Sequence, residues 1–361
     1  MCYSPMRSGG SPPPASGSDG TDSRTARVAT ARRRYREQPC DTVQRSGPRT
    51  ERVRVFPPGT ANPGAGGAGT DVSQAERLQS AMRGCEWCFH AAASYHLWLP
   101  DYRPMYAANV EGTRTVLEAA ASAGCQRIVY TSTVGCIGLP KATDGRVVPS
   151  DEGTPVSEAQ MSNPYKRSKW QAEQIALELA RKGLPIIIVN PSAPVGPRDV
   201  KPTPTGQVIV DFLNRTMPAY LDTGLNYVHV RDVAQGHVLA AERGRIGERY
   251  ILGNTQGNWT LKESFRVLEE ITGLRGPRAQ IPYFVAWVAA CVDETLSNFT
   301  HKPPKAPLAG VRMAKYKMFF SPAKAIRELG LPQTPPQQAL SDAVDWFRQN
   351  GYVKNINSNM K

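Results

Sequence analysis

Three short apolar segments constrain the fold of this 361-residue chain more than any other feature. Segments 127–131 (R-I-V-Y-T) and 184–189 (L-P-I-I-I-V) are apolar nearly throughout, and 85–90 is similar. A strand of this composition is buried on both faces, as in a parallel sheet. Helical periodicity in 71–83, 109–123 and 164–182 flanks and separates these segments. The pattern predicts a doubly wound α/β fold, with ligand sites at the carboxyl ends of the strands.

Polar or small residues follow each predicted strand directly. His90 and the alanines 91–93 follow the first strand, Ser132 and Thr133 the second, and 190–196 the third. Taken singly, each has an ordinary explanation: a buried histidine, turn residues, or prolines that prevent a helix. Because the carboxyl ends of parallel strands share one edge of a sheet, the sequence predicts that these segments converge.

A tyrosine and a lysine stand four residues apart near the start of the helix predicted at 164–182. Asn163 is a favoured N-cap residue and Pro164 suits the first helical position. The spacing places Tyr165 and Lys169 on one helical face. A cation beside a phenol favours the phenolate, so we expect the pKa of Tyr165 to move from about 10 toward neutrality. The pair would then exchange protons, although Tyr-x-x-x-Lys also arises by chance on solvated helix faces.

The cysteine pattern and the lack of a signal-like segment predict a cytoplasmic protein. Seven cysteines lack the spacing of a disulfide framework, and we interpret Cys85 and Cys88 as buried strand residues rather than metal or redox ligands. The longest apolar run, 281–292, is too short to span a bilayer. We interpret it as a core helix or an interfacial lip over a hydrophobic substrate. The sequence predicts no metal site and no transmembrane segment.

Positive charge is concentrated near the N-terminus. The net charge is +13, and residues 1–70 hold eleven Arg, no Lys and five acidic residues. Such a field favours anionic partners, nucleic acid included, but neither an aromatic-interleaved basic stripe nor a known nucleic-acid module accompanies it. We therefore predict no specific nucleic-acid partner. Residues 1–70 are also rich in Gly, Pro and Ser, which is typical of a disordered segment.

Six motifs together resemble those of the extended short-chain dehydrogenases/reductases, in the NAD-dependent epimerase/dehydratase group. The resemblance covers roughly 75 to 353. The motifs are F-H-A-A-A at 89–93, N-V-E-G-T at 109–113, Y-T-S-T-V at 130–134, Y-K-R-S-K at 165–169, N-P-S-A-P-V-G-P-R-D at 190–199 and Y-V-H-V-R-D-V-A at 227–234. Within the dihydroflavonol-reductase-like branch, the segment 191–206 is most similar to the hopanoid-associated sugar epimerases.

The resemblance implies NAD or NADP as the cofactor and a role for each site residue. Tyr165 would be the general acid/base, and Lys169 would lower its pKa and bind the nicotinamide ribose. Thr133 would polarise the substrate oxygen, Asn109 would help organise the proton path, and Asp232 would help join two lobes. Residues lining the cofactor would be His90, Ala91, Ala92, Tyr165, Lys169, Pro191, Ser192 and Val195.

The family's glycine-rich phosphate-binding turn has no counterpart at its expected place. That place falls in 1–70, where Gly64–Gly69 matches G-x-G-x-x-G but does not directly follow a strand. We interpret the match as accidental. The lysine-free composition of 1–70 resembles a GC-rich coding sequence read in the wrong frame or from an extended start. If so, the N-terminal strands of the nucleotide-binding domain are missing and the sheet has an open edge.

The resemblance implies a nucleotide-binding domain at 71–200 and 225–254, a smaller α/β substrate lobe at 201–224 and 255–352, and a tail at 353–361. It implies an enzyme acting on a nucleotide sugar or a related hydroxyl or carbonyl compound, with a role in hopanoid metabolism. A sugar epimerase and a net ketone reductase both use Tyr, Lys and Thr, so both stay open. An inactive remnant is the third alternative, and a homodimer is an analogy with the family alone.

Overall fold

The computed structural model describes residues 72–143, 146–300, 302–304 and 306–353. The predicted disordered segment 1–70 and its Gly64–Gly69 match therefore lie outside the described residues, as does nearly all of the predicted tail.

Four parallel strands form the central sheet, in the order β1-β2-β5-β9. Their bounds are β1 Trp87–His90, β2 Arg127–Thr131, β5 Ile186–Pro191 and β9 Arg249–Leu252. Strand β5 is buried along nearly its whole length, because the sheet is covered on both faces. The predicted doubly wound α/β fold is confirmed.

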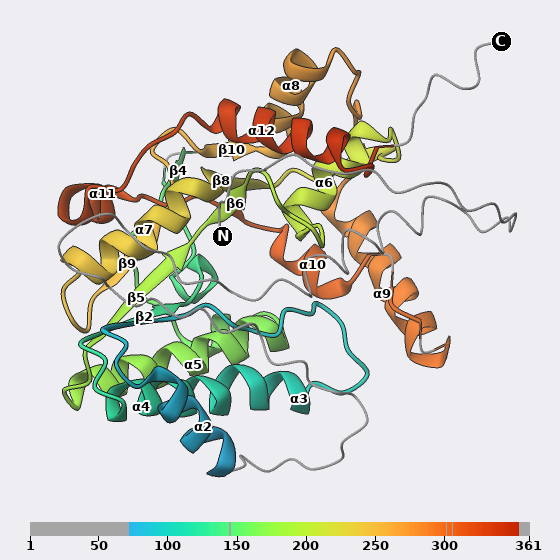
Figure 1. Cartoon of the computed structure of the whole chain (residues 1–361). Helices are drawn as coiled ribbons and strands as arrows, with labels where there is room; N and C mark the ends of the chain where they lie inside the picture. The colour runs from blue at the N-terminus through green and yellow to red at the C-terminus, as the bar shows by residue number, and fades with distance from the viewer. Residues whose placement is uncertain (1–71, 144–145, 301, 305, 354–361) are drawn as a thin grey trace, which may run out of the picture.

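Helices cover both faces of this sheet (Figure 1). One side carries α2 Val72–Met82, α3 Arg103–Tyr106, a π-helix Ala107–Glu111, α4 Gly112–Ser122 and α5 Pro164–Arg181. The other side carries α7 Val230–Arg243 and α11 Ala323–Leu329. As predicted, Asn163 caps α5 by accepting the Lys166 N–H, and Gly183, with a φ of 99°, follows its end.

A second sheet is built around β8, Gly224–His229, which pairs with three short strands. They are β6 Ala193–Val195, β10 Asn258–Thr260 and β12 Lys317–Met318. Helices α6 Pro204–Leu213, α8 Leu261–Thr272 and α12 Pro336–Gln349 share a core with this sheet. The pairing thus places β6 and β8 in the sheet of the smaller lobe. The predicted division, with 71–200 and 225–254 in the larger domain, had assigned both strands to that domain.

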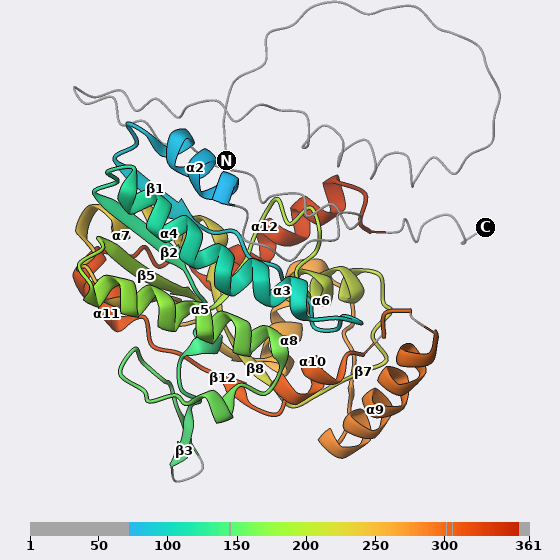
Figure 2. The same ribbon diagram turned by 90° about the horizontal axis from the view of Figure 1, so that it is seen from below.

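The remaining elements lie around the smaller lobe and its junction with the larger sheet. They are 3₁₀ turns Val134–Cys136 and Glu158–Gln160, hairpin β3 Lys141–Thr143 with β4 Arg146–Val148, the pair β7 Ala219–Tyr220 and β11 Ala279–Gln280, α9 Tyr283–Thr300 and α10 Leu308–Met313. Figures 1 and 2 both show α9 at the rim of the molecule. Among the described helices, none is long and apolar enough to cross a membrane.

Two smaller sequence predictions concern Asp232 and the cysteines near β1. Asp232 of α7 accepts hydrogen bonds from the backbone N–H and the hydroxyl of Thr334, at 2.7 and 2.8 Å, and so ties α7 to the segment that leads into α12. Cys85 and Cys88 are both buried as predicted, but only Cys88 lies in β1, and burial raises the pKa of its thiol to about 12. The Cys88 thiol therefore stays protonated at neutral pH.

Candidate active site

Tyr165 lies in the first turn of α5, near the edge where β2 and β5 end. Its side chain is half-buried, and its ring packs edge-on against Tyr95, with the two centroids 4.4 Å apart and the planes at 72°. Burial raises the pKa of the Tyr165 phenol above its ordinary value, and the nearby Tyr95 and Cys136 add to the effect. At neutral pH the phenol therefore holds its proton.

Lys169 is buried one helical turn further along α5. Its ammonium donates to the Tyr130 hydroxyl at 3.1 Å and to the Thr131 carbonyl at 2.9 Å. Burial lowers the pKa of Lys169 to about 8, against the opposing effects of Cys136 and Glu173. The predicted fall in the Tyr165 pKa is wrong for this structure, because the ammonium is hydrogen-bonded to β2 and desolvation sets the direction.

A buried network of hydrogen bonds holds the backbone of Thr133 in place. The Asn190 amide donates to the Thr133 carbonyl at 3.0 Å and to the Glu173 carboxylate at 2.7 Å. Arg249 donates to the same carboxylate at 3.3 Å. The Thr133 hydroxyl accepts the Gly135 N–H at 3.1 Å, so its own hydrogen stays available for donation to another oxygen.

Asn109 holds the loop after β1 in place. Its amide oxygen accepts the Ser94 N–H at 2.7 Å, and its amide nitrogen donates to the Ser94 carbonyl and the Ser168 hydroxyl, both at 3.0 Å. Ser168 in turn donates to the Tyr165 carbonyl at 2.9 Å. These bonds use both amide hydrogens of Asn109, so its observed contacts position the Tyr165 turn. The predicted part in a proton path stays a prediction.

Besides Lys169, two residues predicted to line the cofactor are buried in the structure. His90 contacts the Thr113 hydroxyl at 3.1 Å, and burial, with a smaller effect from Lys169, lowers the pKa of His90 to about 4. Val195 packs into the core of the smaller lobe. Burial of both side chains favours support behind a cofactor over direct contact with it.

The other predicted lining residues offer open surface at the carboxyl edge. Ala91 and Ala92 are exposed directly after β1, and Pro191 and Ser192 are half-buried at the end of β5. Within the described part of the chain, Lys169 uses two of its three N–H groups, which leaves one for a ribose hydroxyl. These features fit the nicotinamide end of a dinucleotide. No strand precedes β1 in that part, so it contains no strand-to-helix turn that would hold a pyrophosphate.

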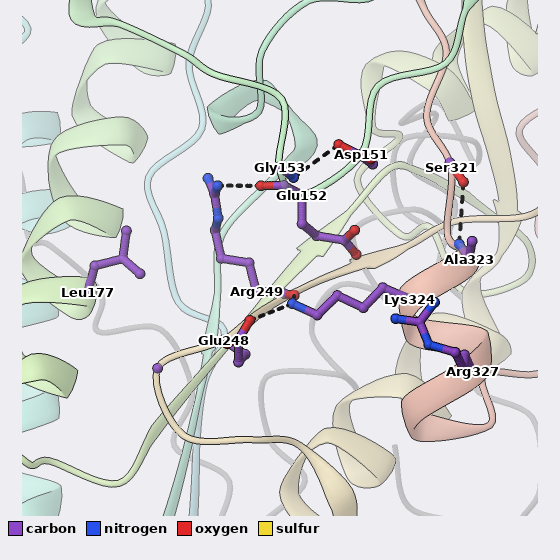
Figure 3. Close-up of a pocket in the computed structure, with 11 residues that line it drawn as sticks. Asp151, Glu152, Gly153, Leu177, Glu248, Arg249, Ser321, Ala323, Lys324 and Arg327 are labelled. Carbon is purple, nitrogen blue, oxygen red and sulfur yellow. Dashed lines mark hydrogen bonds and ion pairs between the residues drawn. The ribbon is translucent and has the colours of Figure 1, made fainter.

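A separate cavity of about 410 Å³ opens near the amino-terminal end of β9, away from the predicted site edge (Figure 3). Its basic side chains already have partners. Lys324 binds Glu248 at 2.6 Å, and Arg249 donates to the Glu152 carbonyl (Figure 3). Among the described residues, no cluster of three or more His, Cys, Asp or Glu side chains could hold a metal.

Comparisons with known proteins identify the family and the fold. The sequence model of the NAD dependent epimerase/dehydratase family matches residues 25–253. A putative dihydroflavonol 4-reductase of Synechocystis sp. is 46% identical over 77% of this chain and 80% of its own length. The crystal structure of gox2253 is 49% identical, with a TM-score of 0.67 over 79% of this chain and 84% of that one.

The structure of PA4631, a nucleoside-diphosphate-sugar epimerase from Pseudomonas aeruginosa, is 28% identical, with a TM-score of 0.62 over 78% of this chain and 82% of that one. The parallel sheet and these relatives define a dinucleotide-dependent α/β oxidoreductase. The chain belongs to the NAD-dependent epimerase/dehydratase family. This confirms the resemblance and the cofactor class, NAD or NADP. The match also extends further toward the N-terminus than the predicted start at about 75.

Sequence reasoning missed three residues of this site. Tyr95 packs against Tyr165, and Glu173 and Arg249 complete the hydrogen-bond network that holds Thr133. Glu173 stands four residues after Lys169, so helical spacing alone places it on the same face. No local signal points to Arg249, which lies 76 residues away from Glu173 in the sequence.

Proposed function

We propose that this protein is an NAD(P)H-dependent reductase that converts a ketone into an alcohol. The observation that carries the proposal is the placement of Tyr165, a half-buried phenol in the first turn of α5, near the edge where β2 and β5 end. A phenol that holds its proton suits the reductive direction, since the carbonyl oxygen gains a proton as its carbon gains hydride. The 46% identity with a putative dihydroflavonol 4-reductase supports the same direction.

Three side chains divide the work in this proposal. The bound nicotinamide would supply the hydride. Tyr165 would donate its proton to the developing alkoxide, and the free hydroxyl hydrogen of Thr133 would stabilise the charge on that oxygen. Lys169, a cation at neutral pH, would bind the ribose through its remaining N–H group.

A nucleotide-sugar epimerase is the second candidate, and the cations across the site favour it. Arg198 and Lys201 are exposed on the loop after β6, and Lys201 is close enough to His96 to help lower its pKa. Because His96 belongs to the loop after β1, these cations stand near the predicted site, where a diphosphate would be attracted. A substrate in hopanoid metabolism stays a prediction for either candidate.

Cofactor binding is the first test. The full chain would be titrated with NADH and with NADPH, and its melting temperature and intrinsic fluorescence followed. A ligand that binds the native state raises the melting temperature as its concentration increases. We expect a saturable rise with at least one cofactor. No shift at millimolar concentrations of either would refute the enzyme and favour the inactive remnant.

Stoichiometry then separates the two activities. A reductase consumes one reduced cofactor for each ketone converted, whereas an epimerase interconverts two sugars with no net cofactor consumption. We expect consumption of the reduced cofactor with a dihydroflavonol-type ketone. Turnover of a nucleotide sugar at constant cofactor concentration would replace the reductase with the epimerase.

A further inference from the structure

Helix α9 reverses the usual burial of an amphipathic helix. The side chains that it turns inward are small: Ala286, Ala290 and Ser297 are buried. The side chains that it exposes are large and apolar, and Phe299 and Phe284 are 80% and 69% exposed. A helix that only completes a globular core carries its large apolar residues on the inner face.

The exposed residues form one continuous stripe, which we call the α9 face. Its members are Phe284, Val285, Trp287, Val288, Val292, Leu296 and Phe299. Five of them, at 284, 288, 292, 296 and 299, lie four or three positions apart, so they line one side of the helix over about four turns. An exposed apolar surface of this kind marks an interaction site.

Charge around the α9 face is positive. Between 281 and 316 the sequence has four Lys or Arg and two acidic residues. Both acidic side chains bind backbone N–H groups of the following segment: Asp293 accepts from Ala306 and Glu294 accepts from Leu308, at 2.8 and 2.9 Å. Lys302, which follows α9, and Arg312 of the packed helix α10 are exposed.

Composition and charge together identify the partner. Apolar residues on one side, a tryptophan that stacks on Phe284 with the ring planes at 25°, and neighbouring Lys and Arg are typical of helices that lie in the interface of a bilayer. The flanking cations complement anionic headgroups. We propose that the α9 face binds the surface of an anionic lipid bilayer, with the helix lying flat in the interface.

The α9 face is linked to the candidate active site by one loop. Trp98 donates from its indole to Asn298 of α9 at 3.4 Å, and Leu97 lies over Gly310 of α10. Tyr95, three residues before Trp98, packs against Tyr165. If the α9 face lies on a bilayer, a lipid-borne substrate would reach Tyr165 beside this loop. That consequence alone rests on the proposed function.

Vesicle co-sedimentation of the full chain tests the proposal. We expect the protein to sediment with vesicles of phosphatidylcholine and phosphatidylglycerol, less with phosphatidylcholine alone, and less as salt increases. The double variant Phe284→Ser/Phe299→Ser should bind about tenfold more weakly or worse, since it removes two apolar anchors. Ile246→Ser, which alters an exposed apolar residue outside α9, is the matched control.

A charge variant tests the lipid class. Lys315, which follows α10, is exposed as well, and the variant Lys302→Glu/Arg312→Glu/Lys315→Glu should abolish the preference for phosphatidylglycerol. Equal binding to both vesicle types, or an unchanged preference in this variant, would overturn the anionic surface. Failure of the wild-type chain to sediment with vesicles would overturn the proposed bilayer contact. So would a wild-type homodimer that becomes monomeric in the double Ser variant while vesicle binding stays unchanged.

Cofactor titration of the double Ser variant separates this proposal from the proposed function. The α9 variant should bind NADH or NADPH as the wild type does, because none of its altered side chains belongs to the site. A wild-type chain that binds vesicles but no cofactor would refute the enzyme and leave the membrane contact standing.

Discussion

Helices α5 and α9 have the same length of 18 residues and opposite relations to solvent. Helix α5 buries charged side chains, Lys166, Lys169 and Glu173, beside the carboxyl edge of the sheet. Helix α9 exposes Phe284 and Phe299 and buries alanines. Both break the rule that charge lies outside and large apolar groups inside. Burying a charged group, or exposing a large apolar one, costs free energy. Such exceptions are therefore expected mainly at functional sites.

The largest expected effect comes from the phenol of α5. Tyr165→Phe should lower turnover about a thousandfold, because no proton donor would remain beside the developing alkoxide. Initial rates of ketone reduction measure it, and NAD(P)H titration should show an unchanged dissociation constant. Tyr316→Phe, an exposed tyrosine of the smaller lobe, is the control. Full turnover in the Tyr165 variant would remove the acid/base role.

The buried ion pair between Glu173 of α5 and Arg249 should contribute more to stability than any exposed pair of that helix. Glu173→Ala leaves Arg249 and Asn190 without their carboxylate partner, so we expect a loss of about 4 kcal/mol in the free energy of unfolding. Urea unfolding measures it. Glu178→Ala on the same helix removes only an exposed pair with Lys182 and should change stability by about 0.5 kcal/mol or less. Equal losses in the two variants would contradict this account.

Acid should destabilise the α5 side of the sheet through His90. Burial lowers its folded pKa from 6.5 to about 4, so the unfolded chain binds this proton more readily. The stability contribution is fully present above pH 6.5 and is lost as pH falls toward 4, by about 3 kcal/mol. His90→Asn should flatten the pH dependence of the unfolding free energy in that window. The variant His96→Asn, at an exposed histidine, is the comparison. If it flattened the pH dependence of the unfolding free energy equally, the effect would not be specific to His90.

The smallest effect is expected on α9. Phe299→Ser should change the free energy of unfolding by about 0.5 kcal/mol or less, because this side chain contributes little to the core despite its size. Thermal unfolding without lipid measures it. A loss of 2 kcal/mol, about that of a buried Phe, would show that the α9 face is covered within the protein itself.

The elements and the family were predictable from local sequence. The apolar run of β5, the Asn163 cap and the Gly183 stop are short-range signals, each decided by neighbouring residues. The motifs at 89–93, 130–134 and 165–169 placed Tyr165, Lys169 and Thr133 at one edge, because a parallel sheet brings its carboxyl ends together. The division into lobes was less predictable, since β6 follows β5 after one residue and pairs with β8 instead.

By itself, the sequence determined the strands, the caps and the chemical groups of the site. Tertiary structure alone decided how those groups behave. It desolvated Tyr165 and raised its pKa, bound Lys169 to Tyr130 and Thr131, and brought Arg249 to Glu173. It also decided which face of α9 meets solvent. Burial and charge pairing depend on residues far apart in the chain, so local pattern fixes the identity of a side chain but not its surroundings.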